Sequence, residues 1–154
     1  MSDTVVRPRP DQLERRAAGR DRRNQPVPDW NLGGMPGAGA LYSTAHDLLI
    51  FARAHLHPEA TRLADALRLV QEPRAKANRW VSVGLGWHKI QVRGTRNTAL
   101  WHNGGTGGFS SHLSMLPHAD AGVVVLANTA RPVDQIGFRV LQRLAKATPP
   151  NKTI

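Results

Sequence analysis

One stretch of the chain, residues 101–128, places polar side chains directly before a run of glycines. It begins W-H-N-G-G-T-G-G, so that His102 and Asn103 precede four glycines interrupted only by Thr106. A backbone without Cβ atoms can adopt positive φ and can lie directly against a ligand. This stretch therefore predicts a place where a substrate meets the edge of a strand.

The residues on either side of the glycines predict a set of short strands. Alternating apolar residues predict a half-buried strand over 109–116, and a β-branched run predicts a buried strand over 122–128. The Pro/His/Ala/Asp link at 117–120 is typical of a hairpin. Two earlier strands are predicted over 81–92 and 98–103. Because all the links are short, the four strands predict an antiparallel meander.

Helical patterns flank the predicted sheet. Ser43 or Thr44 is a candidate N-cap for a helix that runs to His57-Pro58. A second amphipathic helix fits roughly 60–71, and a C-terminal helix fits from Pro132 to about Ala147. The expected fold class is α+β, an antiparallel sheet meander with flanking helices.

The sequence divides into three parts. Residues 1–32 contain several prolines and too few apolar residues to hold themselves in place, so they predict an irregular surface segment. That segment must lie on another part of the protein or be mobile. Residues 33–147 hold the predicted sheet and helices, and residues 148–154 predict a frayed tail. A length of 154 residues is ordinary for a single domain.

Composition sets further bounds. The chain is 40% hydrophobic and 21% charged, which is typical of a folded globular protein. No cysteine is present, which excludes disulfides and thiolate chemistry. No apolar run approaches the ~20 residues of a membrane helix, and the first residues lack the apolar core of a signal peptide. We therefore expect no membrane span and no signal peptide in this chain. These features assign no cellular location.

The net charge of +10 raises the question whether the protein binds nucleic acid. The basic residues are spread along the chain without a block of five or six like charges, a pattern that favours a diffuse Arg-rich surface. We therefore expect no nucleic-acid partner. A nucleic-acid-binding protein would instead show a steep salt dependence of its affinity.

The glycines and histidines of the chain match no known cofactor or metal motif. The glycine-rich loop over residues 33–40 matches neither G-x-G-x-x-G nor a phosphate loop, so a nucleotide is not expected. His55, His57 and His88 lack the spacing to acidic residues of known metal motifs, so no metal and no other cofactor is expected.

A nucleophile–base pair within residues 110–112 is excluded by strand geometry. Ser110 and Ser111 lie beside His112 in the sequence. Adjacent residues on a strand point to opposite faces, so Ser111 and His112 cannot face each other.

Taken together, two blocks resemble the serine β-lactamase-related family, which includes class C β-lactamases, D-alanyl-D-alanine carboxypeptidases, esterases and amidohydrolases. One block is P-G-A-G-A-L-Y-S-T-A-H-D-L-L-I-F-A at residues 36–52. The other is W-H-N-G-G-T-G-G-F-S-S, followed by V-V-V-L-A-N. The opening M-S-D-T also resembles an interior segment of such proteins. The resemblance implies a partial β-lactamase/transpeptidase-like fold and a small-molecule acyl substrate.

The resemblance also implies roles for residues 102–106. The family builds its site from S-x-x-K, from Y-x-N and from a [KH]-[TSN]-G strand. His102-Asn103-Gly104 matches the last motif. By resemblance, His102 orients a substrate carboxylate or assists proton transfer, and the N–H of Gly105 forms half of an oxyanion hole. The side-chain amide of Asn103 contacts the substrate, Gly104 permits close approach, and Thr106 is grouped with these substrate-binding residues.

The other two family motifs are absent from this sequence. The four lysines are preceded three residues earlier by proline, glycine or arginine, and the single tyrosine, Tyr42, precedes Ser43-Thr44. The chain therefore resembles the C-terminal half of such an enzyme without its nucleophile. We expect it to be inactive alone, with a companion chain as a source of the missing half. Its sheet would then expose an edge, and self-association would follow.

The alternative interpretation is a non-catalytic module that binds a ligand or peptide along the glycine-lined strand edge.

Overall fold

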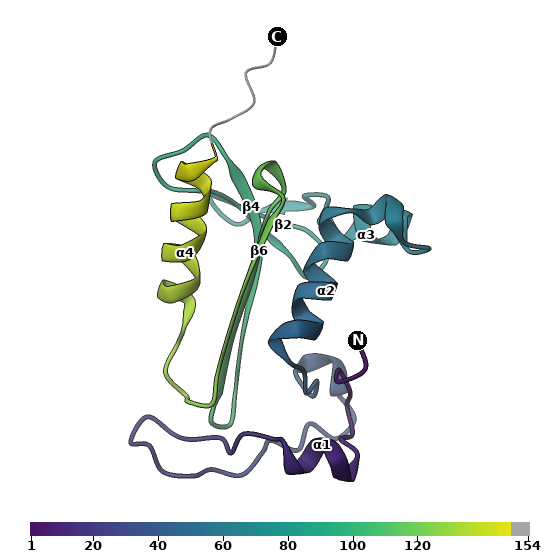
Figure 1. Ribbon diagram of the computed structural model, residues 1–154. Helices are drawn as coiled ribbons and strands as arrows, with labels where there is room; N and C mark the ends of the chain where they lie inside the picture. The colour runs from purple at the N-terminus through teal and green to yellow at the C-terminus, as the bar shows by residue number, and fades with distance from the viewer. Residues whose placement is uncertain (149–154) are drawn as a thin grey trace.

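The computed structural model describes residues 1–148, so the predicted tail over 148–154 lies outside the described residues except for Thr148. A six-stranded antiparallel sheet forms the centre of the protein, and its strands lie side by side in chain order from β1 to β6. Helix α4 covers one face, whereas α2 and α3 lie on the other (Figure 1). The expected α+β meander with flanking helices is confirmed.

The strands are β1 (Ala75–Lys76), β2 (Val81–Val83), β3 (His88–Gln91), β4 (Thr98–Thr106), β5 (Phe109–Leu116) and β6 (Ala121–Ala127). The α-helices are α1 (Pro10–Glu14), α2 (Ala45–Leu56), α3 (Ala64–Gln71) and α4 (Asp134–Ala147). Three 3-10 turns complete the described chain: η1 (Pro36–Ala38), η2 (Pro58–Ala60) and η3 (Pro117–Ala119).

The single strand predicted over 81–92 is wrong, because the chain turns back on itself between β2 and β3. Gly84 N donates to Trp87 O at 2.8 Å, and Gly86 adopts φ +82° in the turn. A Cβ on Gly84 would lie 2.6 Å from the carbonyl oxygen of Val70 at the end of α3. The turn therefore depends on glycine at two positions, one for its backbone angle and one for close packing.

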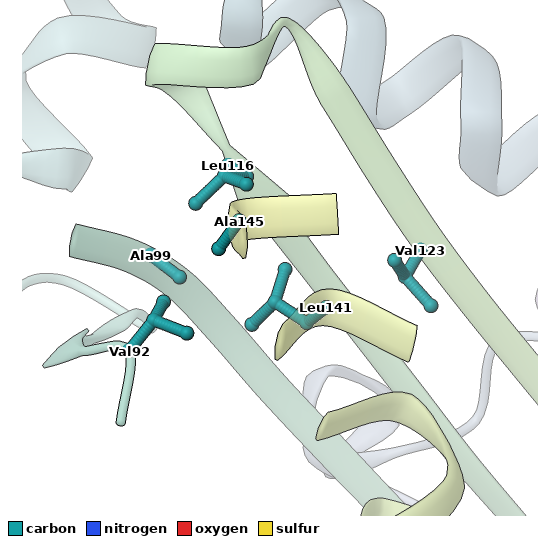
Figure 2. Packing of buried hydrophobic residues seen from close by; sticks show 6 residues of the cluster. All are labelled: Val92, Ala99, Leu116, Val123, Leu141 and Ala145. Carbon is teal, nitrogen blue, oxygen red and sulfur yellow. The ribbon is translucent and has the colours of Figure 1, made fainter. Parts of the chain in front are cut away.

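Each face of the sheet has its own buried cluster. On the α4 side, Leu141 and Ala145 pack against strand and loop residues (Figure 2). On the α2 side, Ala52 packs with Trp87, Leu100 and Met115. The α4-side cluster consists of Val92, Ala99, Leu116, Val123, Leu141 and Ala145. Because neighbouring strand residues face opposite ways, Ala99 and Leu100 place β4 in both clusters.

The N-cap of α2 is Thr44, whose Oγ1 accepts a hydrogen bond from Asp47 N at 3.2 Å. Asp47 is itself buried, and its carboxylate accepts from Asp3 N at 2.8 Å and from Thr4 Oγ1 at 2.9 Å. The cap therefore also fastens the first residues of the chain to the start of α2.

The segment over residues 1–32 crosses the end of the sheet where the long β4–β5 hairpin turns (Figure 1). Arg20 N donates to Gly108 O at 3.0 Å, and Ala130 N donates to Arg20 O at 2.8 Å. A further hydrogen bond joins Asn128 Nδ2 to Ala18 O at 3.0 Å. The segment is therefore tied to the hairpin on one side and to the β6–α4 connection on the other.

One outer strand of the sheet, β6, pairs only with β5 among the described residues. Beside it, α2 and β6 border a groove of about 840 Å³, at which Leu49 and Ile50 are exposed. Leu126 of β6 is also exposed. Among the helices of residues 1–148, none has both the length and the apolar character needed to cross a bilayer.

His55 gives the fold a predicted pH dependence. Its ring is buried between Phe51 and Trp87, and Nδ1 accepts a hydrogen bond from Gln71 Nε2 at 3.1 Å. Burial lowers the pKa of His55 from its ordinary value of 6.5. The imidazole of His55 therefore binds a proton more readily in the unfolded chain than in the folded chain. The contribution of His55 to the free energy of unfolding is complete above about pH 6.5 and is lost as the pH falls below that value.

The prediction is checked by urea unfolding between pH 8 and pH 5, where the free energy of unfolding should fall. In His55→Asn, which keeps an acceptor for Gln71, this fall should be smaller. Equal falls in both proteins would contradict a role for His55.

Candidate functional site

The second half of β4 has a free edge. Strand β3 pairs with β4 only from Thr98 to Trp101, whereas β5 pairs with β4 from Leu100 to Thr106. Within residues 1–148, the stretch 102–106 therefore has a neighbouring strand on one side only. This is the stretch in which the sequence predicted a strand edge facing a substrate.

The hairpin register fixes which backbone groups point outward. Thr106 and Phe109 pair directly across a two-residue turn, so this closing pair exchanges its hydrogen bonds. Such pairs alternate along an antiparallel ladder, which makes Gly105–Ser110 the pair without mutual backbone hydrogen bonds. The N–H and C=O of Gly105 therefore point away from β5 toward the free edge.

The four glycines within residues 104–108 do not share one role. This corrects the expectation that all of them expose the backbone to a ligand. A Cβ on Gly105 would meet no atom within 4 Å, so this residue faces open space. A Cβ on Gly104 would lie 2.6 Å from Ser111 Oγ on β5. Gly107 lies against Trp30, and Gly108 has φ +78° beneath the N-terminal segment. These two glycines serve the hairpin turn and its packing.

His102 is exposed at the start of the free edge, where its Nδ1 lies 2.6 Å from Asn103 O. A carbonyl oxygen can only accept, so Nδ1 carries the hydrogen in this contact. In the neutral ring, Nε2 is then the acceptor nitrogen. The hydrogen bond therefore selects the tautomer in which Nε2 can take up a proton.

Asn103 points to the opposite face, where it reaches the start of α4. Its Nδ2 donates to Asp134 Oδ2 at 2.8 Å. Thr106 lies at the far end of the edge, and a Cβ on Gly39 would be 3.5 Å from its Cγ2. The second glycine-rich loop, residues 33–40, therefore meets the hairpin beside Thr106.

Behind Asn103, a buried polar chain extends into the protein. His112 is fully buried, with Nδ1 at 3.1 Å from Asp134 Oδ1 and Nε2 at 3.0 Å from Ser114 Oγ. Ser111 takes no part in this chain, whereas Ser110 Oγ donates to Thr129 O at 2.9 Å. The serine that contacts His112 lies two residues along the strand, on the same face, and has no exposed surface. It is therefore placed as a structural partner and not as an accessible nucleophile.

These elements enclose a small pocket of about 290 Å³ between the β4–β5 hairpin and the start of α4. Of the predicted site residues, Asn103, Gly104, Gly105 and Thr106 line it, whereas His102 does not. The remaining lining residues are Phe109, Ser110, Ser111, Ala130, Pro132, Val133 and Asp134.

Asp134 is the lining residue that sequence reasoning missed. In the sequence it is simply an acidic residue near a helix start, which the helix dipole favours in any helix. Only the pairing of β4 with β5, together with the packing of α4 on that face, brings it to Asn103.

The remaining histidines lie in other surroundings. His57 Nε2 lies 2.6 Å from Asp120 Oδ1, and His55 is bonded to Gln71. Within residues 1–148 no group of three or more histidine or acidic side chains is arranged to hold a metal ion.

Comparison with known proteins places the chain in a family. The sequence model of the β-lactamase family matches residues 1–146. The D-alanyl-D-alanine-carboxypeptidase/endopeptidase AmpH of Escherichia coli is 27% identical over 138 residues, which cover 82% of this chain and 35% of AmpH. The unguisins hydrolase ungD of Aspergillus violaceofuscus is 28% identical over 130 residues, covering 71% of this chain and 23% of that protein.

Solved structures share the fold. A class C β-lactamase superposes with a TM-score of 0.83 at 19% identity, covering 96% of this chain and 48% of that protein. A β-lactamase/D-alanine carboxypeptidase from Pseudomonas syringae gives 0.78 at 19% identity, covering 96% and 49%. The chain thus spans about half the length of these structures and about a third of AmpH. By its sequence match over residues 1–146 and by its fold, the chain belongs to the β-lactamase family.

Proposed function

We propose that this chain forms one wall of an acyl-transfer site that acts on small amide or ester substrates, as in β-lactams or D-alanyl peptides. The observation that carries the proposal is the free edge of β4, along which the Gly105 N–H points outward and the imidazole of His102 is exposed. Backbone donors on a rigid strand are suited to an oxyanion, because they need no reorganisation as charge develops.

Each predicted residue has a role in this proposal. Gly105 N–H supplies one hydrogen bond to the oxygen of the attacked carbonyl. His102, with Nε2 as its acceptor nitrogen, assists proton transfer. Asn103 and Thr106 contact the substrate from the pocket side of the edge. Gly104 contributes differently from the expectation, because its missing side chain leaves room for Ser111.

The nucleophile would come from outside this sequence, which contains neither S-x-x-K nor Y-x-N. We propose that the chain alone binds substrate without turnover, and that a companion polypeptide with both motifs completes the site. The outer edge of β6 supports this arrangement, because a strand that pairs on one side only among the described residues, beside exposed Leu49 and Ile50, is a ready surface for a partner.

Acylation kinetics test the proposal. With a chromogenic cephalosporin or a p-nitrophenyl ester, the chain alone should give no burst of product. Adding a companion that carries S-x-x-K and Y-x-N should restore a burst stoichiometric with the complex. A stoichiometric burst from the chain alone would contradict the proposal.

Gly105→Leu is the matched variant. No atom lies within 4 Å of the added Cβ and φ is not positive, so the fold should persist by circular dichroism. Its side chain should nevertheless block the edge and lower the burst rate of the complex about 100-fold, the lower end of the range seen on loss of an oxyanion donor.

The second candidate is a binding module that holds an extended peptide along β4 by adding a strand. The same free edge favours it. It predicts saturable peptide binding that Gly105→Leu abolishes, with no turnover even when the companion is present.

A further inference from the structure

We propose that Asp134 sets the charge preference of the pocket beside β4, so that the pocket accepts neutral or cationic acyl compounds and disfavours a carboxylate. The inference rests on the proposed function and narrows it: among amide and ester substrates, the site favours those without a carboxylate over β-lactams and D-alanyl peptides that carry one. It starts from the pocket lining, in which Asp134 is the only charged side chain within the described part of the chain.

The carboxylate of Asp134 is held at the pocket wall from two sides. Oδ2 accepts from Asn103 Nδ2 at 2.8 Å, and Oδ1 lies 3.1 Å from His112 Nδ1. With 26% of its side chain exposed, Asp134 still reaches the pocket. Its negative charge is therefore fixed in place and only partly screened by water.

The imidazole of His112 lies behind Asp134 and has a hydrogen-bond partner at each nitrogen. His112 Nε2 lies 3.0 Å from Ser114 Oγ, and a hydroxyl can donate to a neutral ring. With a hydrogen on Nδ1, the ring donates to Asp134 and accepts from Ser114. These contacts hold the Asp134 carboxylate in one orientation at the pocket wall.

No positive charge in the lining offsets Asp134. The nearest cation in the sequence, Arg131, donates through Nη2 to Arg22 O in the N-terminal segment at 2.9 Å. Its guanidinium is therefore directed away to that segment. A ligand carboxylate placed near Asn103 would approach Asp134 without a cation among the described lining residues to compensate, and it would compete for an amide that Asp134 already engages.

Two ligands of the same shape test the inference. N-acetyl-D-alanine carries a carboxylate, and N-acetyl-D-alanine amide replaces it with a neutral group. Titration of the ¹⁵N-labelled chain at pH 7.5, followed at the amide of Gly105, gives both dissociation constants without any need for catalysis. The neutral amide should bind about tenfold more tightly, the size of one like-charge contact in a partly solvated site.

Asp134→Asn should reduce this ratio to near one, because asparagine retains an acceptor oxygen and loses the charge. Asp11→Asn removes the same charge from an exposed position on α1 and should leave the ratio unchanged. If the carboxylate ligand binds as tightly as the amide in the unaltered chain, the charge preference is wrong while the proposed function stands. If neither ligand shifts Gly105, the proposed function fails and the inference fails with it.

Discussion

Replacing Gly137 with alanine should destabilise the chain by about 2 kcal/mol, although alanine is the better helix former. Gly137 lies in α4 directly above His112, and an added Cβ would be 2.2 Å from the ring atom Cδ2. The ring cannot move aside cheaply, because Asp134 and Ser114 hold both of its nitrogens. Overpacking of this kind costs about 3 kcal/mol, and the helix preference returns about 1 kcal/mol.

The loss is measured by urea or thermal unfolding. Gly37→Ala is the matched control, since the added Cβ there meets nothing within 4 Å, and its stability should change by less than about 0.5 kcal/mol. A double-mutant cycle with His112→Ala identifies the cause. Gly137→Ala should lower the free energy of unfolding much less in the His112→Ala background, which lacks the ring. Unchanged cost in that background would show that the ring is not the obstacle.

Truncating Leu141 to alanine should remove about 2–5 kcal/mol of stability. Leu141 is 1% exposed and lies at the centre of the cluster between α4 and the sheet, against residues such as Leu116 and Val123 (Figure 2). The surrounding strands are tied by the ladder and cannot close the resulting cavity fully. The cost therefore combines lost burial with the cavity itself.

Val140→Ala provides the comparison for Leu141 on the same helix. Val140 is 41% exposed, so its truncation should change the free energy of unfolding by only about 0.5 kcal/mol. Equal losses at the two positions would mean that α4 is not packed on the sheet through Leu141.

Most of the fold could be predicted because its signals are local. Apolar periodicity predicts β5, β6, α2, α3 and α4 within a few residues, and residue type and place predict Ser43 or Thr44 as the cap of α2, of which the structure shows Thr44. The turn between β2 and β3 could not be predicted in the same way. Its requirement for glycine comes partly from the carbonyl of Val70, and that contact forms only when α3 packs beside Gly84.

The residues of the candidate site also fall into those predicted from a contiguous stretch of sequence and those brought together only by the fold. The sequence could predict the exposed edge at His102 to Thr106, because the polar tripeptide and the glycines are contiguous. It could not show that Gly107 and Gly108 serve the turn, since their neighbours come from the distant N-terminal segment. It also could not find Asp134, which meets Asn103 across 31 positions of chain.

The chain-order arrangement of the sheet has a consequence for how the protein folds. Every strand pairs only with strands adjacent in sequence, so residues 75–127 can assemble as successive hairpins with short loop closures. Proteins dominated by such local contacts fold quickly for their size. During synthesis residues 75–127 emerge before α4, so the α4-facing side of the sheet stays uncovered until Leu141 and Ala145 arrive to complete its cluster.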